Sequence, residues 1–396
     1  MSVRLEPILD LPQEVQDIAQ RLTNAGFETW CVGGALRDWL LEHPSGDFDL
    51  ATAATPEQVQ QLFPHTVAVG IKYGTVGVLD RHRSLHEVTT FRKDVTTDGR
   101  HAVVEYGASL EEDLARRDFT INALAYHPLR QEWRDPFGGA QDLDGRVIRA
   151  VGDPARRFAE DYLRILRAIR FSARFGFMID ADTWKAAIAG ASGLRHLSAE
   201  RVRDEWVKGL ESAKSVQRLV ELWREVGAAA IWLPELLPTF PLASASPDPR
   251  DPIVLTAALC SDAAAALARL RSSNAELARV RAIAAAPPPP EGEPPGAVAV
   301  RRWLSRVGDA VGDLQSLARV RTGEAPAWAA VVAGIQSRRE ATSRGQLAVS
   351  GHDLSGAGVP SGPELGRLLS RLLDAVLDDP SLNTRDRLLE MVRAWK

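Results

Sequence analysis

The stretch that decides the fold runs from Cys31 to Leu50 and reads CVGGALRDWLLEHPSGDFDL. It ends in a strand-like run that carries Asp47 and Asp49, and side chains two residues apart on a strand share one face. Two carboxylates this close repel each other unless a cation lies between them. Mg²⁺ prefers hard oxygen ligands and often takes one or two protein carboxylates together with substrate phosphates. The D-x-D pair therefore predicts a magnesium site.

A glycine pair precedes this acidic run. Gly33 and Gly34 stand between an apolar, strand-like segment over residues 28–32 and a helix-like segment over residues 35–41. Glycines let backbone N–H groups approach an anion, and a helix N-terminus adds a favourable dipole. A D-x-D pair on its own is often two solvated turn carboxylates. The prediction gains its weight from the succession of a phosphate-binding turn and a metal-binding strand.

This succession, G-G-x-x-R-D followed by D-x-D, resembles the head of the class II tRNA nucleotidyltransferase and bacterial poly(A) polymerase superfamily, which belongs to the polymerase β-like nucleotidyltransferases. The resemblance implies that Gly34 and Arg37 bind nucleotide, and that Asp47 and Asp49 are catalytic and hold Mg²⁺. It also implies a third catalytic carboxylate from a later strand. Glu87 is the candidate for that role, and an ordinary exposed strand glutamate is the alternative.

Length and composition restrict the class of protein. The chain has 396 residues, which is too long for one ordinary core, so several domains are expected. Hydrophobic residues make up 45% and charged residues 25%, as in globular proteins. We expect no membrane span and no signal peptide, because no long apolar run occurs and residues 1–12 lack the signal pattern. Two cysteines, Cys31 and Cys260, fit a reducing compartment, so we expect a cytoplasmic protein.

The first 150 residues predict an α/β pattern. A helix is expected over residues 11–25 and another after Thr55, and strands over residues 66–69, 75–79 and 86–91. Lys93 to Arg100 is polar and contains a glycine, so it is expected to form a loop between strands. Its Asp98-Gly99-Arg100 core resembles the flexible loop of relatives that complete the whole CCA end, with Ala102 where a proline is usual.

A second polar motif follows at residues 114–125, LARRDFTINALA. Arginine side chains suit triphosphate oxygens, and aspartate and asparagine suit ribose hydroxyls. An Arg-Arg-Asp triple alone is more often a solvated face with local ion pairs. The match to the superfamily's second motif reverses that weighting and implies that Arg117, Asp118 and Asn122 bind nucleotide. Residues 135–145 are rich in turn formers and are expected to connect the head to a neck.

Residues 157–175, RFAEDYLRILRAIRFSARF, follow helical spacing. The apolar stripe is Tyr162, Ile165, Leu166, Ile169 and Ala173. The polar stripe is Asp161, Arg164, Arg167 and Arg170, and its alternative reading is a solvated surface. The sequence closely matches the superfamily's nucleotide-selecting motif, which implies that this stripe binds nucleotide and that Asp161 and Arg164 face the Watson–Crick edge of the incoming base. Arginine only donates hydrogen bonds and an ionised aspartate only accepts them, so the pair could select cytosine or adenine without a nucleic-acid template.

The remainder of the chain predicts helices. A proline-rich run at residues 287–295 is expected to be an extended connector. Residues 351–366 match a C-terminal signature of the superfamily. His352 and Asp353 within it are expected to cap or pack a helix rather than to bind metal. The His-Asp pair of a phosphohydrolase module is absent, because the corresponding helix reads Leu259 to Asp262, LCSD.

The predicted fold class is α+β. A polymerase β-like nucleotidyltransferase head with a small mixed sheet is expected over residues 1–150 and a helical neck with the nucleotide-selecting motif over 151–215. A helical body is expected over residues 216–290 and a helical body and tail that bind tRNA over 297–396.

The resemblance implies that the protein adds CCA to the 3′ end of tRNA with CTP, ATP and Mg²⁺ and releases pyrophosphate. A poly(A) polymerase and a partial enzyme that adds only CC or only A remain as alternatives. A non-catalytic RNA-binding relative is a further alternative, and the intact Asp47, Asp49 and Arg117 argue against it.

Overall fold

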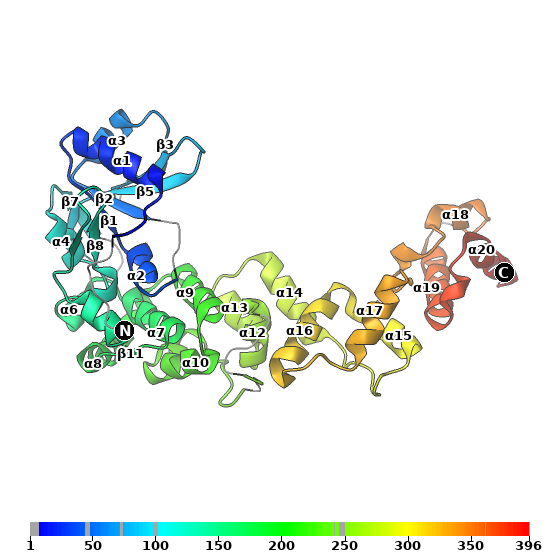
Figure 1. Ribbon diagram of the computed structural model, residues 1–396. Helices are drawn as coiled ribbons and strands as arrows, with labels where there is room; N and C mark the ends of the chain where they lie inside the picture. Colours follow the sequence, from blue (N-terminus) through cyan, green and yellow to red (C-terminus); the bar gives the residue numbers. More distant parts are fainter. Residues whose placement is uncertain are drawn as a thin grey trace. The chain divides into compact units, whose positions relative to one another are not determined.

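The computed structural model describes residues 8–43, 48–71, 74–97, 102–240, 242–244, 250–360 and 362–395, without the side chains of residues 93–97 and 102–105. The chain forms two units, Met1–Pro234 and Glu235–Lys396. The first unit combines a sheet with helices, and the described elements of the second are helices (Figure 1). This agrees with the predicted α+β class. The boundary between the units lies inside the segment predicted as the body, residues 216–290.

A seven-stranded mixed sheet forms the centre of the head. Its strands, in spatial order, are β3 (Thr66–Gly70), β4 (Thr75–Leu79), β5 (Leu85–Thr90), β2 (Asp49–Thr52), β1 (Thr29–Val32), β8 (Ala125–His127) and β9 (Glu132–Arg134). Only β2 and β5 are parallel neighbours among these strands. Leu50, Val76 and Val88 are buried on one face. Helices α1 (Gln13–Asn24) and α3 (Pro56–Leu62) pack against the sheet and against each other (Figure 1).

Local sequence signals account for the ends of several head helices. Thr55 accepts a hydrogen bond from the backbone N–H of Gln58, whose side chain accepts one from the backbone N–H of Thr55, and Pro56 occupies the first position of α3. Ser109 and Glu112 form the same reciprocal capping box at α4 (Leu110–Ala115). Such caps satisfy the backbone donors that a helix start leaves unpaired. Helix α2 (Gly34–Leu40) starts directly after Gly33, as predicted.

The prediction of a loop over residues 93–100 is wrong for residues 93–97, which belong to a strand. Strand β6 (Arg92–Thr97) pairs with β7 (Ala102–Tyr106) as an antiparallel ladder. Val95, Thr96 and Thr97 are β-branched and favour extended backbone, which outweighs the polar composition that suggested a loop. The Asp98-Gly99-Arg100 core lies outside the described residues.

Two helices, rather than the single helix expected over residues 157–175, form the start of the neck. α6 (Pro154–Glu160) ends before Asp161, whose backbone is extended (φ −157°, ψ 104°), and α7 (Leu163–Phe175) follows. The side chain of Asp161 accepts a hydrogen bond from the backbone N–H of Leu163, so it compensates for the break. Four of the five residues of the predicted apolar stripe are buried, namely Ile165, Leu166, Ile169 and Ala173.

Helix α7 packs against α9 (Ala199–Ser212) and α10 (Val216–Glu225). Trp206 and Trp223 are fully buried in this packing, with ring centroids 5.1 Å apart in an edge-to-face arrangement. The other elements of the first unit are η2 (Thr120–Asn122), α5 (Gly139–Asp144), β10 (Val147–Ile148), β11 (Met178–Ile179), α8 (Ala181–Ala189), η3 (Ala191–His196) and α11 (Ala228–Trp232).

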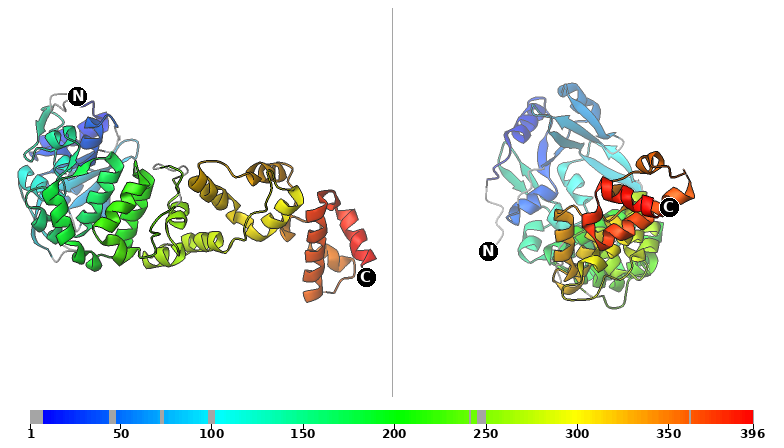
Figure 2. Two further views of the ribbon diagram at one scale, coloured as in Figure 1. Left: turned by 90° about the horizontal axis from the view of Figure 1, so that it is seen from below. Right: turned by 90° about the vertical axis from the view of Figure 1, so that its right-hand side faces the viewer.

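The second unit contains α12 (Pro252–Leu259), α13 (Ala263–Arg269), α14 (Asn274–Ala285), α15 (Ala297–Val307), η4 (Gly308–Ala310), α16 (Val311–Thr322), α17 (Trp328–Ser337), η5 (Arg344–Gln346), α18 (Gly351–Gly356), α19 (Pro363–Asp378), η6 (Pro380–Leu382) and α20 (Arg385–Ala394) (Figure 2). The predicted proline-rich connector joins α14 to α15 without helix or strand. Asp353 forms a capping box with Ser350 at α18, as expected of a cap.

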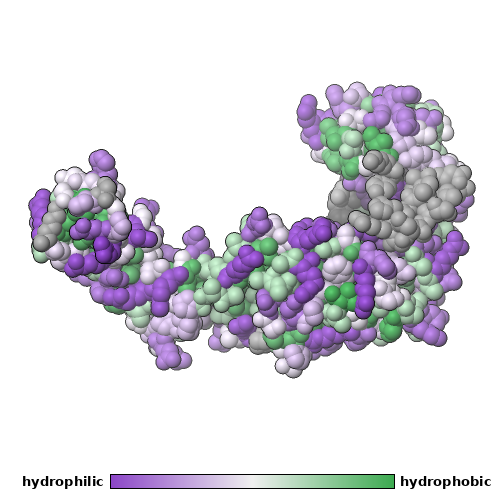
Figure 3. Space-filling view, turned by 180° about the vertical axis from the view of Figure 1, so that it is seen from behind, coloured by the Kyte–Doolittle hydropathy of each residue, from purple (hydrophilic) through white to green (hydrophobic). Residues whose placement is uncertain are grey.

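Hydrophilic and apolar side chains are interspersed on the face that Figure 3 shows. In the part of the chain that the structure describes, no helix is long and apolar enough to cross a membrane.

Candidate active site

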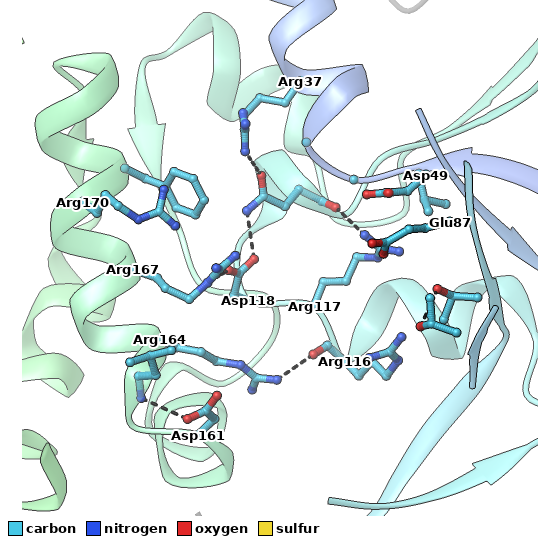
Figure 4. A pocket seen from close by; sticks show the side chains of 18 of the residues that line it. Arg37, Asp49, Glu87, Arg116, Arg117, Asp118, Asp161, Arg164, Arg167 and Arg170 are labelled. Carbon is cyan, nitrogen blue, oxygen red and sulfur yellow. Dashed lines mark hydrogen bonds and ion pairs between the residues drawn. The ribbon is translucent and has the colours of Figure 1, made fainter. Parts of the chain in front are cut away.

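A pocket of about 600 Å³ lies in the first unit, and residues of the head and the neck line it together. Figure 4 shows Arg164, Arg167 and Arg170 of α7 on one side and Asp49 and Glu87 on the sheet strands on the other. Every predicted site residue that the structure describes lines this pocket: Gly34, Arg37, Asp49, Glu87, Arg117, Asp118, Asn122, Asp161, Arg164, Arg167 and Arg170. Asp47 lies outside the described residues.

The carboxylates of Asp49 and Glu87 share one face of the sheet. In the parallel pairing of β2 and β5, Leu50 is opposite Val88, so Asp49 and Glu87 occupy equivalent positions one residue earlier. Because side chains alternate along a strand, both point away from the face that buries Leu50 and Val88. The described residues include no group of three or more acidic, His or Cys side chains that could hold a metal. Asp49 and Glu87 supply two adjacent carboxylates of the kind that Mg²⁺ takes.

Gly33 allows a close approach at the start of α2. Its φ of +84° lies in the left-handed region that favours glycine. A Cβ at this position would lie 3.2 Å from Nη1 of Arg117 and 3.7 Å from Oδ2 of Asp49. The glycine therefore brings the backbone of the turn, a cation and a carboxylate together at one edge of the pocket.

A buried aspartate that the sequence reasoning missed orients the arginine pair of the second motif. Oδ1 of Asp113 accepts hydrogen bonds from Nε (3.0 Å) and Nη2 (2.7 Å) of Arg116, and its Oδ2 accepts one from Nη2 of Arg117 (3.2 Å). Burial acts to raise the pKa of Asp113, but the charges of Arg116 and Arg117 hold that pKa below its ordinary value. The spacing of three and four residues along one helical turn was the signal that could have identified Asp113.

Asn122 and Asp118 join the helix of the glycine turn to the neck through a chain of hydrogen bonds. Nη1 of Arg37 donates to Oδ1 of Asn122, and Nδ2 of Asn122 donates to Oδ1 of Asp118 at 2.9 Å. Nε of Arg167 donates to Oδ2 of Asp118 at 2.7 Å. Burial acts to raise the pKa of Asp118, but the charge of Arg167 and these hydrogen bonds lower it to about 2. Both carboxylate oxygens already serve this network, so a contact with ribose remains a prediction.

Glu205 of α9 is the second buried carboxylate that the sequence reasoning missed. It accepts a hydrogen bond from Nε of Arg170 and lies 3.9 Å from Nη1 of Arg167. The ring of Phe171 lies below the guanidinium groups of both arginines, 4.3 Å from that of Arg170 and 5.2 Å from that of Arg167. Glu205 falls in the buried stripe of α9 beside Trp206. A carboxylate at such a position signals a buried partner.

The proposed base-selecting residues lie at the break between α6 and α7. Oδ1 of Asp161 accepts from the backbone N–H of Leu163 (3.1 Å), and its Oδ2 accepts from Nη2 of Arg201 (2.6 Å). Arg201 belongs to α9 and was not singled out in the sequence. These two hydrogen bonds therefore fix both oxygens of the Asp161 carboxylate.

Arg164 is held by contacts of its own. Its Nη1 donates to Oε2 of Glu160 (2.7 Å) and to the backbone carbonyl of Arg157 (2.8 Å). Its Nη2 donates to the backbone carbonyl of Arg116 (2.9 Å). These contacts fix the guanidinium across the junction of head and neck, and Glu160 is the neighbouring acid of the same motif.

The pocket carries an excess of positive charge. Nine arginines and four carboxylates are among the described residues that line it. Among the described residues, Nε of Arg117 and Nη1 of Arg201 are buried and have no hydrogen-bond partner. A cluster of guanidinium groups with unused donors suits a polyanion such as a triphosphate, which can accept several charge-assisted hydrogen bonds.

Two family models match this chain. The poly A polymerase head domain matches residues 29–149, and a model described as the probable RNA and SrmB-binding site of polymerase A matches residues 176–239. Among curated relatives, the CCA-adding enzyme of Leuconostoc mesenteroides is 49% identical over 217 residues, which is 54% of each chain. That of Geobacillus stearothermophilus is 43% identical over 226 residues, which is 57% of this chain and 55% of the relative. The matched segment spans about half the length of these relatives.

Solved structures extend the likeness over the whole chain. The crystal structure of the Bacillus stearothermophilus CCA-adding enzyme in complex with CTP superposes with a TM-score of 0.79 at 33% identity, covering 96% of this chain and 98% of that one. The Thermotoga maritima CCA-adding enzyme complexed with tRNA superposes with a TM-score of 0.65 at 18% identity, covering 99% and 98%. The second likeness shows the shared fold.

Proposed function

Because the chain belongs to the family of CCA-adding enzymes, we propose that it is a nucleotidyltransferase that transfers CMP and AMP from CTP and ATP to the 3′ end of tRNA and releases pyrophosphate. The observation that carries this proposal is that one arginine-rich pocket places Asp49 and Glu87 of the sheet opposite Asp161 and Arg164 of the neck. The similarity to a CCA-adding enzyme solved with CTP supports the choice of nucleotide.

In this proposal Asp47 and Asp49 hold Mg²⁺, and Glu87 supplies the third carboxylate. Bound there, the metal would lower the pKa of the attacking hydroxyl and neutralise charge on the triphosphate. Asp49 lies at the start of β2, where its neighbour Gly33 leaves room for a phosphate chain. The protein's contribution is to place the reacting groups and to surround them with fixed charges, as in other phosphoryl transfers.

The arginines would hold the triphosphate. Arg117 lies within reach of both the glycine turn and the carboxylate strand, and its Nε has no hydrogen-bond partner among the described residues. Asp113 accepts hydrogen bonds from both Arg116 and Arg117 and so restricts the rotamers of the two arginines. Their guanidinium groups are therefore already oriented before a nucleotide binds. A phosphate group is common to all nucleotides, so these residues supply affinity rather than choice of base.

Choice of base would come from Asp161 and Arg164. Cytosine and adenine both present an amino donor beside a ring nitrogen that accepts, whereas uracil and guanine present the reverse pattern. An ionised aspartate and an arginine match the first pattern and oppose the second. Hydrogen-bonding sites reject analogues strongly when the mismatch leaves buried polar groups unpaired. A protein template of this kind needs no nucleic-acid template.

The tRNA would contact the helical part of the chain. The match of residues 176–239 to an RNA-binding family model and the similarity to an enzyme solved with tRNA support this partner. We include the helical segment 297–396 in the tRNA surface, where phosphate contacts and shape would position the acceptor end. A cytoplasmic location also belongs to the proposal, because Cys31 and Cys260 are buried free thiols.

One assay tests the reaction. The purified protein is incubated with tRNAs that end in the discriminator base, in -C or in -CC, and is supplied with CTP, ATP or both. We expect two C residues from CTP, one A on the -CC substrate, and no extension beyond the complete end. Long A tracts would favour a poly(A) polymerase. Failure to add A to the -CC substrate would identify a CC-adding enzyme, and failure to add C would identify an A-adding one.

A further inference from the structure

Arg201 of α9 lies against the carboxylate of the base-selecting aspartate. Its Nη2 donates to Oδ2 of Asp161 at 2.6 Å, and it lines the same pocket. The two side chains are 32% and 26% exposed, so the pair is partly shielded from water. Arg201 lies forty residues further along the chain than Asp161 and outside the segment that resembles the nucleotide-selecting motif.

We propose that Arg201 is a positioning residue that determines base specificity by holding the Asp161 carboxylate toward the incoming base. This inference rests on the proposed function. The helix break places Asp161 on extended backbone, where, among the described residues, the Leu163 N–H and Arg201 donate the hydrogen bonds to its two oxygens. Selection of an amino group requires a carboxylate oxygen at one fixed place. Without Arg201 the carboxylate can turn, and the acceptor no longer opposes the carbonyl oxygen of uracil or guanine.

A second observation concerns the other arm of the guanidinium. Nη1 of Arg201 is buried and has no hydrogen-bond partner among the described residues. A buried donor without a partner is unfavourable, and a bound ligand that accepts from it removes that penalty. Arg201 therefore holds Asp161 with one nitrogen and keeps a second donor for the contents of the pocket.

The simpler interpretation is an ion pair that only ties α9 to the neck. That interpretation predicts a change in stability and an equal change in the use of all four nucleotides. Positioning of Asp161 predicts a change in the ratio between nucleotides. Measuring the ratio of rates with matched and mismatched nucleotides therefore distinguishes the two interpretations. A general loss of stability lowers the rates with all nucleotides and leaves this ratio unchanged.

The test compares Arg201→Gln and Arg201→Lys with Arg203→Gln as the matched control. Arg203 lies on the same helix, outside the pocket lining, and its side chain donates to Asp204. Single-turnover rates are measured for CTP and UTP on tRNA that ends in the discriminator base, and for ATP and GTP on tRNA that ends in -CC. We expect Arg201→Gln to reduce both preferences about ten- to a hundredfold, as for loss of a charged hydrogen bond. Arg201→Lys should restore part of this preference, and Arg203→Gln should leave it unchanged.

A double-mutant cycle tests whether Arg201 acts through Asp161. In an Asp161→Ala background, Arg201→Gln should cause no further loss of preference, because the group that Arg201 positions is already missing. Additive losses would overturn the proposal, as would an unchanged CTP-to-UTP ratio in Arg201→Gln. If Arg201→Gln does not fold, Arg201→Lys decides the question, since lysine keeps the charge without the guanidinium fork, and an unchanged ratio there overturns the proposal.

The outcome for the proposed function is read separately. If the unsubstituted protein binds CTP in preference to UTP but extends no tRNA, the proposed reaction fails. The inference about Arg201 is then tested by the binding preference of the same variants, measured by equilibrium titration with CTP and UTP. Equal binding preferences in the unsubstituted protein and in Arg201→Gln would overturn it.

Discussion

Replacement of Asp118 by asparagine should destabilise the first unit by an amount that depends on pH. The carboxylate is buried, and it accepts hydrogen bonds from Arg167, Asn122 and the backbone N–H of Phe119. Its pKa of about 2, against an ordinary 3.8, corresponds to roughly 2.5 kcal/mol at about 1.4 kcal/mol per pKa unit. Removal of one partner from a buried pair typically costs about 3–5 kcal/mol. We therefore expect the variant to lose about 2.5–5 kcal/mol at pH 7.

The pH dependence follows from the direction of the pKa change. The pKa of Asp118 is lower in the folded protein than in the unfolded chain, so its stabilising effect is fully present above the unfolded value of 3.8. It is lost as the pH falls through the folded value of about 2. At pH 3 the wild type should already have lost roughly 1 kcal/mol of this contribution, and Asp118→Asn none of it. The difference between the two proteins therefore narrows as the solution is acidified.

The measurement is urea unfolding at pH 7, 5 and 3, followed by hydrogen–deuterium exchange in peptides from α7, which reports on the first unit alone. Asp204→Asn is the control, because Asp204 is 52% exposed and pairs with Arg203 at the surface. It should change the unfolding free energy by less than about 0.5 kcal/mol. Equal stability of Asp118→Asn and wild type at pH 7, or a difference that widens toward pH 3, would refute this reasoning.

Three further predictions concern the reaction. Asp49→Ala should abolish nucleotide transfer while tRNA binding, measured by filter retention, stays near normal; retained turnover in Mg²⁺ would contradict the metal assignment. Asp161→Ala should reduce the preference for CTP and ATP over UTP and GTP, whereas Arg117→Ala should raise the KM of all four nucleotides alike. Steady-state kinetics with each nucleotide measures both effects, and an unchanged preference in Asp161→Ala or a changed preference in Arg117→Ala would contradict these roles. Deletion of residues 95–100 should leave CC addition largely intact and stop the reaction before the terminal A, because one base-selecting pair must change its shape between cytosine and adenine. A gel assay follows the two steps, and equal slowing of C addition and A addition would refute this role of the loop.

Short-range signals in the sequence predicted the head well. The turn at Gly33, the strand that carries Asp49 and the helix after Thr55 each depend on residues within a few positions. The structure places each of these elements within one or two residues of the prediction. The pattern of these signals is sufficient because caps and turns are decided by local hydrogen bonds.

Long-range partners could not be predicted in the same way. Glu205 and Arg201 meet the neck motif only because α9 packs on α7, and no local spacing indicates that packing. The break at Asp161 was also missed, because the apolar stripe has the same helical spacing that an unbroken helix would show. The pairing of β6 with β7 escaped prediction because three β-branched residues, Val95 to Thr97, lie in a segment that otherwise has a loop-like composition.

The parallel pairing of β2 with β5 is one of several long-range contacts that complete the pocket, and together these contacts set the point during synthesis at which the pocket can form. The β2–β5 pairing joins residues that are nearly forty positions apart, and the Asp118–Arg167 pair spans 49. The pocket lining runs from Val32 to Arg201, so a nascent chain must expose α9 outside the ribosome before the lining is complete. Until then the growing chain carries its acidic strand without the guanidinium groups of the neck. Loop closures of this length slow folding, so we expect nucleotide binding to appear late, after about half of the chain has emerged.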